Sequence, residues 1–139
     1  MNLSEQIHEL NLETSSILRE IGNNIGLTLA QVQLLLTVPF SSISMTELSQ
    51  ILGIDNSTLT RNLNKLEFQG FVHRNKDDYD KRVYKIILSN KGLSTKDTIE
   101  TQLGDYSYKL LSELSFEDRQ IIFESLEKLS WAFTKIKHS

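Results

Sequence analysis

Apolar residues recur every three or four positions over most of the chain, which is the spacing of helices with one buried face. Near the N-terminus this spacing predicts a helix from about Ser4 to Ile21, which Gly22-Asn23-Asn24 is expected to break. A second helix is expected to begin at the capping-box sequence Thr28-Leu29-Ala30-Gln31. It should stop before Pro39, because proline lacks the N–H that a helix needs.

Two further helices are predicted close behind. Ser44-Met45-Thr46-Glu47 again has capping-box form and predicts a short helix that ends before Gly53. Asp55 suits the N-cap of the next helix, roughly Asn56–Gln69, and Gly70 suits its left-handed C-terminal position. Three leucines at i, i+4 and i+7 would form the buried face of that helix: Leu59, Leu63 and Leu66.

After Gly70 the pattern becomes that of a β-hairpin. The segments 71–74 and 83–88 are rich in β-branched and aromatic residues, whereas residues 75–82 between them are polar and charged. A helix–turn–helix followed by a two-stranded ribbon is the winged helix-turn-helix arrangement, in which one helix enters the major groove of DNA and the ribbon, or wing, flanks it.

The last third of the chain predicts two long helices, the first from Ser89 and the second after the capping sequence Ser115-Phe116-Glu117-Asp118. Each has an apolar stripe at helical spacing: Ile99, Leu103, Tyr106 and Leu110, then Ile122, Leu126, Leu129, Phe133 and Ile136. Further apolar residues widen the last helix beyond one face: Ile121, Phe123 and Trp131. Packing within one chain would explain such stripes, but the excess apolar surface favours contact with a second copy.

Charge changes this picture by marking one segment as special. The chain carries a net charge of −3, yet residues 60–91 contain eight of its 15 Lys and Arg against four acids, a local net charge of +4. Such asymmetry is typical of a nucleic-acid contact surface on an otherwise acidic body.

In the fourth predicted helix, the basic and polar residues lie on one face. At about 100° per residue, the face opposite the leucines contains Ser57, Arg61 and Asn64, flanked by Thr60 and Lys65. These residue types contact base edges and phosphates, and the commonest base pairings are Arg with guanine and Asn with adenine. A solvated helix face is the alternative, but such faces usually contain Glu, and these five positions contain no acid. The pattern therefore favours DNA contact.

The wing supplies a second candidate contact. An arginine that protrudes from a wing suits the narrow, negative minor groove of A·T-rich DNA. We assign this role to Arg82, and we expect Asp80 to orient its guanidinium group. The alternative is a surface ion pair in a loop, which would contribute little to stability.

These residues resemble the winged-helix core of the MarR family of transcriptional regulators. The resemblance rests on the following segments: Thr46-Glu47-Leu48, Ile51-Leu52-Gly53-Ile54, Ser57-Thr58-Leu59-Thr60-Arg61, Gly70-Phe71-Val72, Arg74, Asp80-Lys81-Arg82 and Leu88-Ser89-Asn90-Lys91-Gly92. The middle wing residue, Lys81, departs from the usual arginine and lacks its guanidinium fork. Two further acids, Asp77 and Asp78, are expected to weaken or tune the DNA contact of the wing.

The resemblance implies a mainly helical α+β fold with about six helices and a two- to three-stranded wing. It implies one domain over residues 1–139, with a winged-helix lobe at 28–93 and dimerisation helices at 1–25 and 94–139. The DNA-binding residues that it implies are Ser57, Thr58, Thr60, Arg61, Asn64 and Lys65 on the helix and Arg74, Asp80, Lys81 and Arg82 on the wing.

The expected function is that of a homodimeric transcriptional regulator, a repressor, that binds a pseudo-palindromic operator in double-stranded DNA. Family members bind small aromatic effectors near the dimerisation helices, and four aromatic residues are candidates to line such a pocket: Phe40, Tyr106, Tyr108 and Trp131. Aromatic residues at helical spacing are more often core residues, so we assign none of them to a ligand site. The alternative function is a winged-helix module for protein contact, since fold does not fix function.

Composition excludes several other classes. The chain has no cysteine, which removes disulfides and thiol chemistry, and it has no apolar run of membrane-spanning length. It contains neither a phosphate-binding glycine loop nor a His-Glu-x-x-His motif, and His8, His73 and His138 are dispersed. We therefore expect a soluble cytoplasmic protein that is not an enzyme and needs no cofactor or metal.

Overall fold

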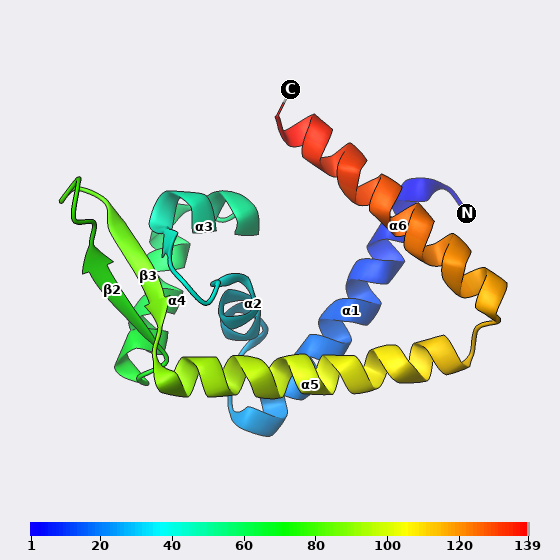
Figure 1. Ribbon diagram of the computed structural model, residues 1–139, viewed down its shortest axis with the longest axis horizontal. Helices are drawn as coiled ribbons and strands as arrows, with labels where there is room; N and C mark the ends of the chain where they lie inside the picture. The colour runs from blue at the N-terminus through cyan, green and yellow to red at the C-terminus, as the bar shows by residue number, and fades with distance from the viewer. Residues whose placement is uncertain (139) are drawn as a thin grey trace. The chain divides into compact units, whose positions relative to one another are not determined.

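The computed structural model describes residues 1–138, which form six α-helices and a three-stranded antiparallel sheet (Figure 1). The elements in chain order are α1 (Leu3–Ile25), α2 (Leu29–Thr37), β1 (Ile43–Ser44), α3 (Met45–Leu52), α4 (Asn56–Phe68), β2 (Val72–Lys76), β3 (Tyr84–Leu88), α5 (Asn90–Ser112) and α6 (Phe116–Lys137). The predicted mainly helical α+β class is confirmed, with a winged helix-turn-helix at its centre.

The N-termini of the helices confirm most of the predicted caps. Thr28 and Gln31 form the complete capping box of α2, with both reciprocal hydrogen bonds present. The side chain of Asp55 accepts from the Thr58 N–H at 2.7 Å, and this bond is the main reason that the pKa of Asp55 lies below its usual value. At α3 the Ser44 hydroxyl caps the Glu47 N–H, but the structure has no reciprocal capping box there.

The predicted break at Gly22 is wrong, because α1 continues for one more turn to Ile25 and Gly26 provides its left-handed C-cap at φ 74°. Gly22 has a different role, which is close packing. A Cβ atom at this position would lie 2.5 Å from the Leu27 carbonyl oxygen and 2.9 Å from Cγ2 of Val32. The chain therefore needs glycine where α1 meets the start of α2, although the helix itself is not interrupted.

The sheet has the order β1-β3-β2, so β3 is the central strand. Figure 1 shows β2 and β3 side by side as the hairpin. The hairpin register pairs Val72 with Leu88 and Arg74 with Ile86. Asn75 and Lys76, predicted as loop, continue the ladder opposite Lys85 and Tyr84. The end of β2 was predicted too early because Asn75 and Lys76 are polar. Backbone pairing on an edge strand does not require apolar side chains.

The core of this part of the chain holds α4 in place. Leu59, Leu63 and Leu66 are completely buried, as the stripe predicted. Phe71, just before β2, and Val72, its first residue, are also buried. The start of α5 is fixed to the same point, because the Ser89 N–H donates to the Phe71 carbonyl oxygen at 2.9 Å. Helix α4 and the wing are thus anchored at a common end.

The chain forms two compact units, Met1–Gln102 and Leu103–Ser139. The first contains the winged helix, α1 and the start of α5. The second contains the end of α5 and the whole of α6, in which none of the 22 residues is buried. Within residues 1–138, we find no helix that combines the length and the apolarity needed to cross a bilayer.

Candidate nucleic-acid interface

One face of α4 is polar and exposed over its whole length. The side chains of Ser57, Arg61, Asn64 and Lys65 are exposed, whereas those of Thr58 and Thr60 are half-buried at its margins. Nη2 of Arg61 donates to the Thr58 hydroxyl at 3.4 Å, a weak contact that leaves most of its donors directed to solvent. The sequence therefore predicted correctly which residues face away from the core.

Hydrogen bonds of Asp77 and Asp80 stabilise the loop of the wing. The Asp77 N–H donates to the Val83 carbonyl oxygen at 2.8 Å, and the Val83 N–H donates to that of Asp80 at 3.0 Å. A carboxylate oxygen of Asp77 also accepts from the Asp80 N–H at 3.2 Å. Asp77 thus shapes the turn.

Arg82 extends from this loop with 91% of its side chain exposed. Its Nε and Nη2 donate to the two carboxylate oxygens of Asp80 at 3.1 and 3.2 Å. The hydrogen bond from the Arg82 side chain is the main reason that the pKa of Asp80 lies below its usual value. Asp80 orients the guanidinium group, as predicted, although an exposed pair of this kind adds little stability.

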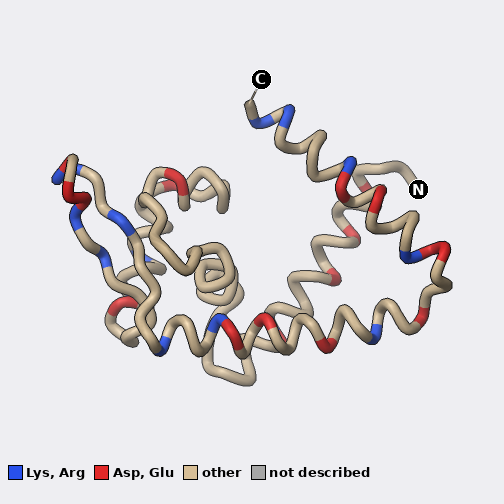
Figure 2. The backbone as a smooth tube through the Cα atoms, viewed as in Figure 1, with Lys and Arg blue, Asp and Glu red and all other residues tan. Residues whose placement is uncertain are grey.

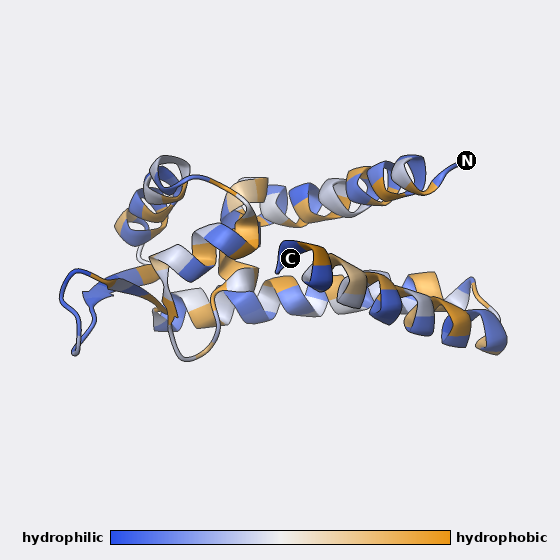
Figure 3. Cartoon of the chain, turned by 90° about the horizontal axis from the view of Figure 1, so that it is seen from above, coloured by the Kyte–Doolittle hydropathy of each residue, from blue (hydrophilic) through white to orange (hydrophobic). Residues whose placement is uncertain are grey.

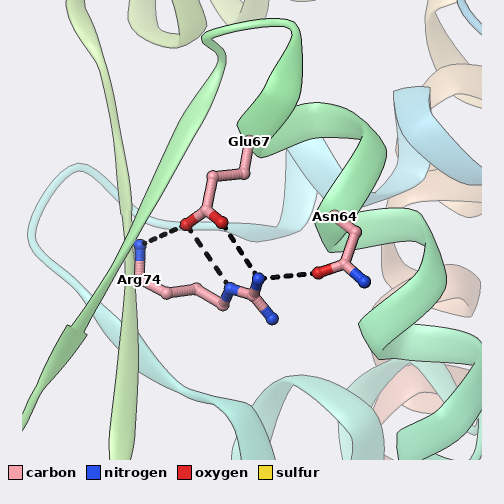
Figure 4. A network of polar contacts seen from close by, with 3 residues as sticks. All are labelled: Asn64, Glu67 and Arg74. Carbon is pink, nitrogen blue, oxygen red and sulfur yellow. Dashed lines mark hydrogen bonds and ion pairs between the residues drawn. The ribbon is translucent and has the colours of Figure 1, made fainter.

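Arg74 was predicted as a DNA contact of the wing, but its guanidinium is engaged within the protein (Figure 4). It pairs with Glu67 of α4 at 2.9 Å and donates to Oδ1 of Asn64 at 2.6 Å. Only 24% of its side chain is exposed. No local sequence pattern indicates this contact, because it joins a strand residue to two residues of a neighbouring helix.

Basic and acidic residues lie close together along the hairpin (Figure 2), and several of them pair with one another. Three basic residues of the segment 60–91 are paired with acids of the same segment: Arg74 with Glu67, Arg82 with Asp80 and Lys85 with Asp77. Lys91 donates to the Gln69 carbonyl oxygen at 2.7 Å and lies over the Phe71 ring. Four side chains carry the exposed positive charge that no such contact engages: Arg61, Lys65, Lys76 and Lys81.

The two extra acids of the wing, Asp77 and Asp78, differ in whether a basic residue pairs with them. Asp77 receives a salt bridge from Lys85 at 3.1 Å, and that hydrogen bond is the main reason that its pKa lies below its usual value. Asp78 is exposed at the tip beside the fully exposed Tyr79. Only Asp78 therefore remains as an acid that would face DNA without a basic partner among the salt bridges of the described residues.

Within residues 1–138, no three His, Asp or Glu side chains are gathered as metal ligands. Three of the four aromatic residues considered for an effector pocket are exposed: Phe40, Tyr108 and Trp131.

Known proteins resemble this chain in both sequence and structure. A sequence model of the MarR family matches residues 25–83. The chain is 25% identical over 105 residues to the HTH-type transcriptional regulator YdgJ of Bacillus subtilis, where the match covers 75% of this chain and 64% of the length of that relative. It is 27% identical over 127 residues to the multiple antibiotic resistance protein MarR of Escherichia coli, covering 91% of this chain and 88% of MarR.

Solved structures of the E. coli protein agree with the fold. The apo form of MarR matches with a TM-score of 0.81 at 26% identity, covering 93% of this chain and 96% of MarR. A mutant MarR complexed with operator DNA matches with a TM-score of 0.76 at 26% identity, covering 91% of this chain and 92% of MarR. In the sequence of residues 25–83 and in its fold, the chain therefore resembles the MarR family of transcriptional regulators.

Proposed function

We propose that this protein binds a specific operator in double-stranded DNA as a homodimer and regulates transcription as a repressor. The observation that carries the proposal is the exposed polar face of α4, which places Arg61 and Lys65 beside Ser57 and Asn64, with no acid at these four positions. A helix with this face, presented beside a wing, suits insertion into the major groove.

The recognition helix would use its residues in two ways. Arg61 extends from the exposed face and would contact a guanine, since its guanidinium offers several donors to the O6 and N7 acceptors. Ser57, Thr58, Thr60 and Lys65 surround it on the same helix and would contact phosphates or neighbouring base edges. The complex of E. coli MarR with operator DNA supports this use of a similar fold.

The wing would contact the adjacent minor groove. Arg82 is exposed, and Asp80 holds its guanidinium in one direction. The side chain would therefore lose less conformational entropy when it binds DNA. Lys81 beside it is exposed and would add attraction to phosphates. Asp80, which orients Arg82, also lowers the net positive charge of the wing. The proposed contact therefore depends more on the orientation of the Arg82 guanidinium than on the total charge of the wing.

The dimer is supported by the apolar surface of α6. Seven large apolar side chains of this helix are exposed in the isolated chain beyond its first residue: Ile121, Ile122, Phe123, Leu126, Trp131, Phe133 and Ile136. A surface of this composition is typical of protein contact. Two-fold symmetry would give two copies of α4 and hence an operator with two inverted half-sites, about 34 Å apart.

A dimer that covers promoter DNA would block access by the polymerase, and we therefore assign repression. A small aromatic effector, which family resemblance implies, stays a prediction. Its binding would act by shifting the equilibrium between dimers that fit the operator and dimers that do not.

Selection from a random pool of duplex DNA tests the proposal directly. We expect the full-length protein to enrich one sequence with two inverted half-sites whose centres lie about 10 base pairs apart. Enrichment of no sequence would contradict DNA-specific regulation and favour the alternative, a winged-helix module for protein contact. Enrichment of a single unpaired half-site would contradict the dimer.

A further inference from the structure

Asn64, Glu67 and Arg74 form one hydrogen-bonded cluster between the recognition helix and the wing (Figure 4). Nη2 of Arg74 donates to Oε1 of Glu67 at 2.9 Å and to Oδ1 of Asn64 at 2.6 Å. The Arg74 backbone N–H and Nε both donate to Oε2 of Glu67, at 3.2 and 3.4 Å. Strand β2 is thus fixed to two positions of α4 that lie three residues apart, on one face of the helix.

The cluster determines which end of the Asn64 amide faces Arg74. A guanidinium has only donors, so it accepts no partner except an oxygen. If the amide turned over, its NH₂ group would meet the Nη2 donor, and a short charge-assisted hydrogen bond would be replaced by repulsion. Oδ1 therefore stays on Arg74, and Nδ2 points away from it, as Figure 4 shows.

Glu67 keeps the arginine in this position. It occupies Nε and one hydrogen of Nη2, which leaves the other hydrogen of Nη2 directed at Asn64. Hydrogen bonds from the Arg74 side chain are the main reason that the pKa of Glu67 lies below its usual value, so the carboxylate is ionised near neutral pH. The amide of Asn64 is consequently fixed before any DNA arrives.

A fixed amide cannot read bases as a free asparagine does. The common pairing of Asn with adenine is bidentate, with Oδ1 accepting from N6 and Nδ2 donating to N7. Here Arg74 takes one lone pair of Oδ1 and holds that end of the amide toward β2, so the end left for DNA is the NH₂ group with its N–H donors. Opposite adenine, one of these donors would meet the N6 amino group, which is also a donor. Opposite guanine, both would meet acceptors, O6 and N7.

We propose that Arg74 is a positioning residue that makes Asn64 a pure hydrogen-bond donor toward DNA, and that Asn64 selects guanine at one position of each half-site. This inference rests on the proposed function, because it assigns specificity to the same recognition helix. It replaces the adenine pairing expected for asparagine in general. It also explains why an arginine of the wing is turned into the protein.

The test compares base preferences of variants by selection from the same random duplex pool. Asn64→Asp keeps the acceptor for Arg74 and replaces the outer donor by a second acceptor. We expect this variant to prefer cytosine, whose N4 amino group is a donor, at the position where the wild type prefers guanine, and to lose about tenfold or more in affinity for the wild-type operator. Asn23→Asp adds the same charge at an exposed position of α1 and should keep the guanine preference.

Two further variants separate an effect on base preference from an effect on the stability of the fold. Asn64→Ala removes the donor without adding charge and should abolish discrimination at that one position only. Arg74→Met removes the partner of the amide, so adenine should become as acceptable as guanine there, even if the melting temperature also falls. Unchanged base preference in Asn64→Ala or in Arg74→Met would overturn the inference. If the wild type itself enriched no sequence, the proposed function would fail first.

Discussion

The side chain of Arg82 is oriented by an ion pair that contributes little to the stability of the fold. Two donors of its guanidinium rest on the two oxygens of Asp80, at 3.1 and 3.2 Å, while 91% of the side chain is exposed. Pairs this exposed contribute little to folding. The value of the pair therefore lies in the direction that it gives to the arginine.

Replacing Arg82 by alanine should weaken operator binding by about 1–3 kcal/mol, because an inserted charged contact is lost. A fluorescence-anisotropy titration of the selected operator measures this loss. Arg19→Ala removes the same charge from an exposed position of α1 and should change the affinity far less. Equal losses for the two variants would mean that Arg82 acts only through the overall charge.

Some residues of the interface could be predicted from the sequence, whereas others could not. Helical periodicity alone places Arg61 and Asn64 opposite the buried leucines, since both facts depend on positions within one helix. The role of Arg74 depends on how β2 packs against α4, and no local pattern encodes that contact. The pairing of Asp77 with Lys85 was not predicted for the same reason, because Lys85 lies across the hairpin.

At the scale of elements, the position of the wing depends on the junction at which β2, β3 and α5 meet. Gly92 in the first turn of α5 is buried against this junction. A Cβ atom there would overlap the Phe71 carbonyl oxygen and would lie 3.3 Å from Cδ2 of Leu88. The sequence predicted a long helix from Ser89, close to the observed start at Asn90, but it did not indicate that Gly92 is required for packing.

Gly92→Ala should lower the free energy of unfolding by about 1–3 kcal/mol, because the backbone carbonyl cannot move away without shifting the strand. Chemical denaturation with urea measures the change. Gly104→Ala is the matched control in the same helix, since a Cβ atom there meets nothing within 4 Å. The control should stabilise the protein by about 0.5–1 kcal/mol, as alanine does in helix interiors. Destabilisation by both variants to the same extent would contradict the packing argument.

At the scale of the whole molecule, the proposed function assigns DNA recognition and self-association to different units. The proposed DNA contacts all belong to the unit Met1–Gln102, whereas α6 lies in the unit Leu103–Ser139 and buries none of its residues. Figure 3 shows apolar segments along α6 and a hydrophilic wing loop. The apolar stripe was predicted from the sequence, but periodicity could not decide whether a second copy covers it.

Leu126→Glu on α6 should weaken self-association by about two orders of magnitude or more, because an unpaired carboxylate in an apolar interface costs several kcal/mol. Sedimentation analysis measures the monomer–dimer equilibrium. Lys128→Glu introduces the same residue at an exposed polar position of the same helix and should leave the dimer intact. A monomeric wild type, or a Leu126→Glu variant that still dimerises fully, would contradict the interface.

The central claim is that the exposed cations of α4 and the wing bind a specific operator, and the salt dependence of that binding tests it most directly. About four cations of each protomer would contact or approach phosphates, so a plot of log Kd against log salt concentration for the selected operator should rise with a slope of about 4–7. A scrambled duplex of equal length should bind at least about a thousandfold more weakly at physiological salt. A slope near zero, or equal affinity for both duplexes, would contradict the account.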